Sequence, residues 1–133
     1  AHFDHKGSKA RHESARLMWR RHVSGKTSEA VIMTGDFNSG EDSDPYNALV
    51  KGAGQIKEGD EPLIDTYRVI HPESTEMEAT FTRWVGHREA KRIAWVLHSR
   101  TFTPLSASIN YTNDKGQHPS DHYPVQAVLR RTQ

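Results

Sequence analysis

The sequence predicts an α/β domain, because a helical pattern near the N-terminus is followed by a short apolar run and then by several strand-like runs. The chain has 133 residues, of which 34% are hydrophobic. A chain of this size supports one modest core and buries roughly two-thirds of its surface on folding. Neither a repeat, a low-complexity tract nor a linker divides residues 1–133, so one domain is expected.

Residues 8–23 carry the first helical pattern. Ala10, Leu17 and Met18 fall near one face of the predicted helix, and basic residues take the opposite face. The pair Ser24-Gly25 is a suitable end for it. We therefore expect an amphipathic helix that packs on a sheet.

A strand and a second helix are predicted next. Residues 30–34 form a continuous apolar run ended by Gly35, which is typical of a strand buried on both faces. The second helix is predicted to begin with Asp44 as its N-cap and Pro45 at its first position, and to end near Gly52.

The second half of the chain is rich in strand patterns. Residues 63–70 fit either a helix or a strand, and residues 71–78 form a polar connection. Residues 93–97, 101–111 and 125–129 are predicted strands.

Composition excludes several kinds of site. Lys and Arg number 18 against 17 Asp and Glu, so a net charge of +1 gives no strong global attraction to nucleic acid or to an anionic membrane. Cysteine is absent, which excludes disulfides, thiolate zinc sites and a cysteine nucleophile. No apolar run approaches the roughly 20 residues of a membrane span, so no membrane partner is expected. The chain opens in a patterned segment without a start methionine, so we expect it to be part of a longer polypeptide.

The segment Gly35-Asp36-Phe37-Asn38-Ser39 is the first candidate site. Asp36 and Asn38 are two residues apart after a strand, so in an extended segment both side chains point to one side. A carboxylate can hold a hard cation or activate a water, and an amide can donate to a phosphoryl oxygen. The alternative is a polar turn in which both side chains bond the local backbone.

The segment Ser120-Asp121-His122 is the second candidate. His122 could act as an acid or base near neutral pH, and Asp121 could hold a metal or a water. The alternative is a loop that closes a turn near Pro119.

A histidine-rich stretch opens the chain. His2 and Asp4 would share one face of a strand, so a zinc site with His5 and His12 is conceivable. Oxygen-rich surroundings without a thiolate favour a hard ion instead.

Five segments in this order resemble successive motifs of the endonuclease/exonuclease/phosphatase superfamily of metal-dependent phosphoester hydrolases. They are Ala1-His2-Phe3-Asp4-His5, Gly35-Asp36-Phe37-Asn38, Ala79-Thr80-Phe81-Thr82, Lys91-Arg92-Ile93-Ala94-Trp95-Val96 and Ser120-Asp121-His122. The resemblance covers nearly the whole chain. It implies a four-layer α/β/β/α sandwich, of which residues 1–133 would be a single partial domain, the C-terminal half.

The resemblance also implies roles for the candidate residues. Asp36 would orient or deprotonate the attacking water, Asn38 and His2 would contact the phosphate, and His122 would stabilise the pentavalent transition state. Asp121, with Asp36, would be the metal ligand of this half. The implied cofactor is Mg²⁺, with Mn²⁺ as a substitute, and the implied substrate is a phosphate monoester or diester of unknown class.

Two departures from the family's pattern lead us to expect no turnover by the isolated chain. The family's N-terminal half brings an Asn and a Glu that is the main Mg²⁺ ligand, and the sequence from Ala1 onward does not include them. Ala94 stands where the family has an Asp that hydrogen-bonds the catalytic His. We therefore expect a partner, either the chain's own N-terminal half or a second copy. The competing interpretation is a non-catalytic binding module that keeps the fold.

Substrate contacts are predicted only in outline. Arg83, Trp84, Arg88 and Arg92 form a basic stretch with an aromatic side chain that could stack a base and hold phosphates. A solvated loop is the alternative.

Overall fold

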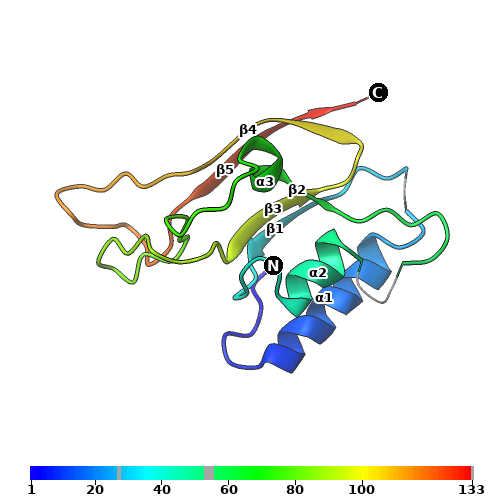
Figure 1. Ribbon diagram of the computed structural model, residues 1–133, viewed down its shortest axis with the longest axis horizontal. Coiled ribbons are helices and arrows are strands. Elements are labelled where there is room, and N and C mark those ends of the chain that lie inside the picture. The colour runs from blue at the N-terminus through cyan, green and yellow to red at the C-terminus, as the bar shows by residue number, and fades with distance from the viewer. Residues whose placement is uncertain (27, 53–55, 133) are drawn as a thin grey trace.

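The computed structural model describes residues 1–26, 28–52 and 56–132, and it has the α/β fold that the sequence predicts. Helices α1 (Ser8–His22) and α2 (Asp44–Val50) pack together on one face of a three-stranded sheet (Figure 1). The hairpin of β4 (Phe102–Ile109) and β5 (Val125–Arg131) lies on the other side of the sheet, together with the short helix α3 (Thr66–Ile70). Among the described residues, no helix is long and apolar enough to cross a bilayer.

The three-stranded sheet has the order β1-β3-β2, and both pairings are antiparallel. Its strands are β1 (Ile32–Asp36), β2 (Ile64–Asp65) and β3 (Ala94–His98). The register places Asp36 opposite Ala94 and Ile32 opposite His98. Strand β1 therefore forms one edge of the sheet, and its C-terminal end carries the first candidate motif.

The hydrophobic core lies between the sheet and helices α1 and α2. The Phe37 ring stacks on Trp95 with centroids 4.5 Å apart, and Tyr46 meets Trp95 edge-on. Trp19 of α1 and Leu49 of α2 are completely buried in the same cluster. Since large aromatic side chains contribute the most buried apolar area, this cluster fixes the end of β1 against both helices.

The buried face of α1 differs from the sequence prediction. Ala10 and Leu17 are exposed, Met18 is half-buried, and the helix instead buries Ala15 and Trp19. Those two residues are four apart and so lie above one another on one face. The much larger apolar area of Trp19 outweighs that of Ala10 and Leu17 in setting which face packs.

Strand β1 is not buried on both faces, contrary to the prediction. Met33 faces the helices, whereas Ile32 is 50% exposed and Thr34 is also exposed. The hairpin covers the central strand β3 but leaves these two positions of the edge strand uncovered.

The remaining elements resolve two further expectations. Residues 63–70 contain both alternatives, because β2 ends at Asp65 and α3 starts directly after it. The Asp65 carboxylate caps α3 by accepting from the Tyr67 and Arg68 amides at 3.0 and 3.3 Å. Helix α2 is capped by Ser43 rather than by Asp44.

Candidate functional site

Asp36 is the last residue of β1, and its two carboxylate oxygens have different partners. Oδ1 accepts a hydrogen bond from the Asn38 amide at 2.8 Å, which closes a tight turn. Oδ2 faces two imidazoles: it lies 3.7 Å from His2 Nε2 and 3.6 Å from His122 Nε2. The turn and the site were alternatives in the sequence, and the structure shows a turn whose other oxygen is directed to the two histidines.

His2, Asp36 and His122 come together from three distant parts of the chain. His2 reaches Asp36 because residues 1–3 run beside the end of β1, with a parallel bridge between His2 and Asp36. Gly35 permits this approach, since a Cβ at that position would overlap the Ala1 backbone. A carboxylate between two imidazoles can orient a water, and each imidazole can donate to an anion when protonated.

Asn38 is held in place beside this cluster. Its backbone has a φ of 47°, in the left-handed region that asparagine tolerates better than most residues. Its side-chain Nδ2 donates to the Phe3 carbonyl at 2.8 Å. One amide hydrogen therefore ties the N-terminal segment to β1, and the second is left for another acceptor.

The loop that carries His122 is fastened by residues 80–82. Thr82 donates from its amide to the Asp121 carbonyl at 2.6 Å and from its hydroxyl to the Ser120 carbonyl at 3.2 Å. Phe81 forms an antiparallel bridge with His122, and their rings lie 5.2 Å apart. The sequence identified residues 79–82 as a motif but gave no role to Thr82. The available signal was the alternation of Thr80 and Thr82 in an extended segment.

Asp121 lies apart from the other candidates in its contacts. Its carboxylate accepts a hydrogen bond from the Ser120 hydroxyl at 3.4 Å. Among the described residues, the ion pairs at this site connect Asp36 with His2 and with His122 and do not include Asp121. Its backbone carbonyl anchors the loop together with that of Ser120. The structure therefore brings together three of the five predicted site residues and attaches Asn38 to them through the backbone.

Ala94 occupies a position directly across from Asp36. The two are paired in register, so their side chains lie on the same face of the sheet. The hydroxyl of Thr80 accepts from the amides of Ile93 and Ala94, each at 3.0 Å. A longer acidic side chain at position 94 would extend from the floor of the site next to Asp36.

A buried network of charges lies behind the site. The Arg92 side chain is 1% exposed and bonds Asp65 Oδ2 at 2.5 Å and Glu41 Oε1 at 2.6 Å. Arg68 joins the same network by bonding Glu41 and Glu78, each at 2.7 Å. Burial by itself would lower the pKa of Arg92, but Asp65 and Glu41 outweigh it and raise that pKa. Arg92 is therefore not free to hold a phosphate, contrary to one of the predicted substrate contacts.

Trp84, the predicted aromatic contact with the substrate, lies in an exposed turn. Trp84 is 60% exposed, and both it and Arg83 adopt left-handed backbone conformations. The Trp84 amide donates to the Thr82 hydroxyl at 2.9 Å, which holds this turn next to the loop of His122. Arg88 lies over the Tyr111 ring at 3.9 Å and so has an intramolecular partner.

The described side chains do not by themselves fit a magnesium ion. Within the described ranges, no three His, Asp or Glu side chains are grouped so as to share a metal. Mg²⁺ prefers octahedral oxygen ligands, and this cluster offers one carboxylate between two imidazoles. The zinc site that was considered for His2, Asp4, His5 and His12, and disfavoured there, is likewise not assembled by the described residues.

Comparison with known proteins identifies relatives by structure rather than by sequence. No protein-family model and no curated protein matches the chain. An endonuclease/exonuclease/phosphatase from Bacteroides vulgatus matches 98% of the chain at 25% identity, with a TM-score of 0.77. A mannosyl-6-phosphatase from Bacteroides thetaiotaomicron matches 97% of it at 25% identity, with a TM-score of 0.73.

A third solved structure, a conserved protein of unknown function from Enterococcus faecalis, matches 99% of the chain at 15% identity, with a TM-score of 0.76. The chain spans 48%, 49% and 48% of the B. vulgatus, B. thetaiotaomicron and E. faecalis proteins, respectively. These matches confirm the resemblance and the fold class, because they cover nearly all of this chain and about half of each neighbour.

Proposed function

We propose that the chain, which has the fold of half an endonuclease/exonuclease/phosphatase domain, contributes to the hydrolysis of phosphate monoesters or diesters. The observation that carries this proposal is the convergence of His2, Asp36 and His122 at the end of β1. Two of the structural neighbours are an endonuclease/exonuclease/phosphatase and a mannosyl-6-phosphatase, which supports a phosphoesterase.

The proposed roles follow from the chemistry of each group. Asp36 Oδ2 orients the attacking water and accepts its proton. His2 and His122, whose Nε2 atoms lie 3.7 and 3.6 Å from that oxygen, donate to the phosphoryl oxygens as negative charge develops on them. Asn38 contributes the amide hydrogen that Phe3 does not use.

Magnesium dependence is a separate part of the proposal. Because the described side chains lack a full set of oxygen ligands, a metal-dependent reaction requires ligands from the other half of the domain. In that arrangement Asp36 and Asp121 are the carboxylates of this half, and the ion would neutralise charge on the phosphate.

We further propose that this chain alone does not turn over and that it associates with its complementary half or with a second copy. About half of each solved neighbour has no counterpart in the chain, and large apolar side chains such as Ile32, Leu105 and Val128 are half exposed. Light scattering coupled to size exclusion should show association, and a stable 15 kDa monomer would count against it.

A sugar phosphate is the first substrate to test. The mannosyl-6-phosphatase among the neighbours motivates it, and the exposed Trp84 next to the His122 loop offers a flat apolar surface to a sugar ring. Nucleotides and phospholipid headgroups are the comparison substrates.

The decisive experiment uses this chain completed with its N-terminal half. Initial rates on mannose 6-phosphate and on bis-p-nitrophenyl phosphate are measured for the wild type and for Asp36→Asn. We expect the substitution to lower kcat by about 10²-fold to 10⁴-fold, the usual contribution of a general base. Equal rates would rule out the role proposed for Asp36.

A non-catalytic binding module is the second candidate, and Ala94 is the observation that favours it. Such a module would bind the phosphate ester at the same three side chains without hydrolysing it. Binding by titration calorimetry with no product release by the completed protein would select this function.

A further inference from the structure

A groove lies along the loop that joins β4 to β5. Its volume is about 540 Å³, which is within the roughly 300 to 1,000 Å³ of small-molecule sites. Residues of this loop line it together with Pro119 and Pro124, which flank the motif Ser120-Asp121-His122 in the chain. One continuous stretch of chain therefore builds both the groove and the position of the His122 imidazole.

Aromatic contacts fix the part of the groove that His118 lines. The His118 ring meets Tyr123 edge-on with centroids 5.5 Å apart, and Tyr111 meets Tyr123 in the same way at 4.7 Å. Gly86 packs against His118, since a Cβ at position 86 would lie only 3.0 Å from the imidazole Nε2. Its φ of 73° also favours glycine. These contacts hold the His118 ring in place before any ligand arrives.

Hydrogen bonds within the loop fix its polar residues. Asp114 and Gln117 exchange backbone hydrogen bonds at 3.1 and 2.8 Å, which close a turn. Asn110 Oδ1 accepts from the amide two residues further on at 2.9 Å, and Asn113 Oδ1 accepts from the amide three residues further on at 2.8 Å. Because both asparagine oxygens are used within the loop, these side chains offer their amide hydrogens to a ligand.

The polar lining suits hydroxyl groups better than a phosphate. Asn110 and Asn113 supply amide donors, and Asp114 supplies a carboxylate acceptor. A hydroxyl group donates and accepts, so it can bond an amide and a carboxylate at the same time. No lysine or arginine is among the described residues that line the groove, so a phosphate would meet the Asp114 charge without a cationic partner.

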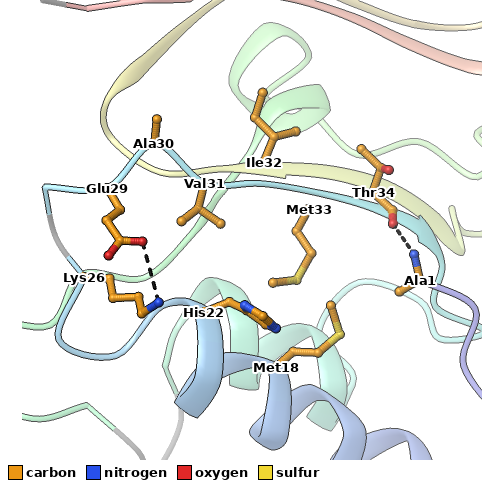
Figure 2. A pocket seen from close by; sticks show the side chains of 10 residues that line it. All are labelled: Ala1, Met18, His22, Lys26, Glu29, Ala30, Val31, Ile32, Met33 and Thr34. Atoms are coloured by element: carbon orange, nitrogen blue, oxygen red, sulfur yellow. Dashed lines mark hydrogen bonds and ion pairs between the residues drawn. The ribbon is translucent and has the colours of Figure 1, made fainter.

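The hollow between α1 and β1 has a different lining (Figure 2). Methionine and aliphatic side chains line it, together with the ion pair of Lys26 with Glu29. None of its lining residues that the structure describes carries a side-chain amide. The combination of amides with a carboxylate therefore distinguishes the groove of the β4–β5 loop.

We propose that this groove is a subsite for a neutral, ring-shaped polyol such as a pyranose. The amides and the carboxylate bind the ring hydroxyls, and Pro119 and Pro124 pack against the apolar C–H groups of the ring. The ligand is a sugar residue of the substrate that does not carry the phosphate. This inference rests on the proposed function only for the phosphate end of that substrate.

The groove is close enough to the proposed active site for one substrate to occupy both. His118 lies four residues before His122, so their Cα atoms are at most about 14 Å apart. A phosphorylated oligosaccharide can therefore place its phosphate beside His122 and another ring in the groove. The subsite would add specificity for a glycan to the hydrolysis proposed above.

A titration with a sugar that has no phosphate tests the subsite. Methyl α-D-mannopyranoside is added to the chain joined to its N-terminal half, and amide chemical shifts are followed by nuclear magnetic resonance. We expect saturable shifts at Gly116 and Gln117 and none at Met33, which lies in the core. Inorganic phosphate should not shift Gly116 or Gln117.

A second titration distinguishes two sources of the ring. With myo-inositol, shifts at Gly116 and Gln117 would assign the ring to an inositol headgroup, whereas shifts with the pyranoside alone would assign it to a glycan. Either result supports a polyol subsite. Shifts with neither compound would overturn it.

A matched pair of substitutions checks which side chains bind the ring. Asn113→Asp removes the amide donor but keeps the oxygen that accepts from Gly116. Gln126→Glu makes the same change from amide to carboxylate at an exposed position of β5 outside the groove. We expect Asn113→Asp to raise the Kd of the pyranoside by about tenfold, as the loss of one net hydrogen bond would, and Gln126→Glu to leave it unchanged.

Equal Kd values for these two variants would overturn the subsite. The binding readout involves neither phosphate nor hydrolysis, so it is independent of the proposed reaction. A protein that binds the pyranoside in this groove but hydrolyses no phosphate ester would contradict the proposed function alone. An active protein whose Gly116 and Gln117 amides do not shift would contradict the subsite alone.

Discussion

Ala94 is the residue at which we expect a substitution to change the chemistry of the site most. It pairs with Asp36 across β1 and β3, so an aspartate there would lie beside Asp36, whose Oδ2 is 3.6 Å from His122 Nε2. We expect Ala94→Asp, in the chain completed with its N-terminal half, to raise phosphodiesterase activity by up to about 10⁴-fold, by analogy with other carboxylates that orient a catalytic histidine. Initial rates on bis-p-nitrophenyl phosphate measure this.

The control for that substitution is Ala94→Asn, because asparagine is nearly the same size as aspartate but carries no charge. It should give much less activity than Ala94→Asp. If the aspartate variant is no faster than the alanine protein, position 94 does not orient the histidine.

We expect His98 to make the stability of the chain depend on pH. It is completely buried, and its Nδ1 lies 2.8 Å from the Thr66 hydroxyl. Burial lowers the pKa of His98 below 6.5, although Asp65 acts in the opposite direction. The unfolded chain therefore binds a proton near pH 6.5 that the folded chain binds only at lower pH, so this stabilisation is present above about pH 6.5 and is lost as the pH falls below it.

Urea unfolding between pH 7.5 and pH 5.5 tests this behaviour. The free energy of unfolding should fall with pH in the wild type, and the fall should be smaller in His98→Gln, which cannot titrate. His87, which is not among the completely buried residues, provides the matched control as His87→Gln. Equal slopes for the wild type and His98→Gln would show that His98 is not the titrating group.

At the scale of elements, the buried network joins α3 to the strand that carries Ala94. Arg92 precedes β3, and Asp65 caps α3 while bonding Arg92. Arg92→Met would leave the buried Asp65 carboxylate without its cationic partner, and we expect the free energy of unfolding to fall by about 3 to 5 kcal/mol. Chemical denaturation measures the loss.

Arg130→Met is the matched control, because Arg130 lies exposed on β5. A change there should stay within about 0.5 kcal/mol, the usual range for a surface substitution. Comparable losses for the two variants would mean that the network contributes no specific stability.

Local patterns predicted most of the elements, and long-range contacts explain where they failed. The three late strands were predicted close to their observed bounds because their apolar runs are short and β-branched or aromatic. The buried face of α1 was wrong because it depends on where Trp19 meets the sheet, which the helical period alone does not define. The pairing of Arg92 with Glu41 spans 51 residues, so no local pattern could reveal it.

In the candidate site, too, local patterns predicted some residues, and long-range contacts explain those that were missed. Asp36 stood out in the sequence because it followed a predicted strand, and His122 because it stands beside an aspartate just before the last predicted strand; the structure places Asp36 Oδ2 3.6 Å from His122 Nε2. The anchoring role of Thr82 depends on contacts with residues 120 and 121, nearly forty positions away. Such contacts are fixed by the fold and not by neighbouring residues.

At the scale of the whole molecule, the chain holds one side of a proposed active site, built from three distant segments. His2 belongs to this cluster because residues 1–3 pair with the end of β1, so the position of its imidazole depends on that pairing. We expect the complementary half to contribute the remaining ligands of the site, because the described side chains lack a full set.

The most direct test of this account is the hydrolysis of bis-p-nitrophenyl phosphate with Mg²⁺ by the isolated chain, by the complementary half, and by the completed Ala94→Asp domain. The account predicts no turnover by either half, clear turnover by the completed domain, and loss of that turnover on His122→Ala. A completed, folded domain whose rate is unaffected by His122→Ala would contradict it.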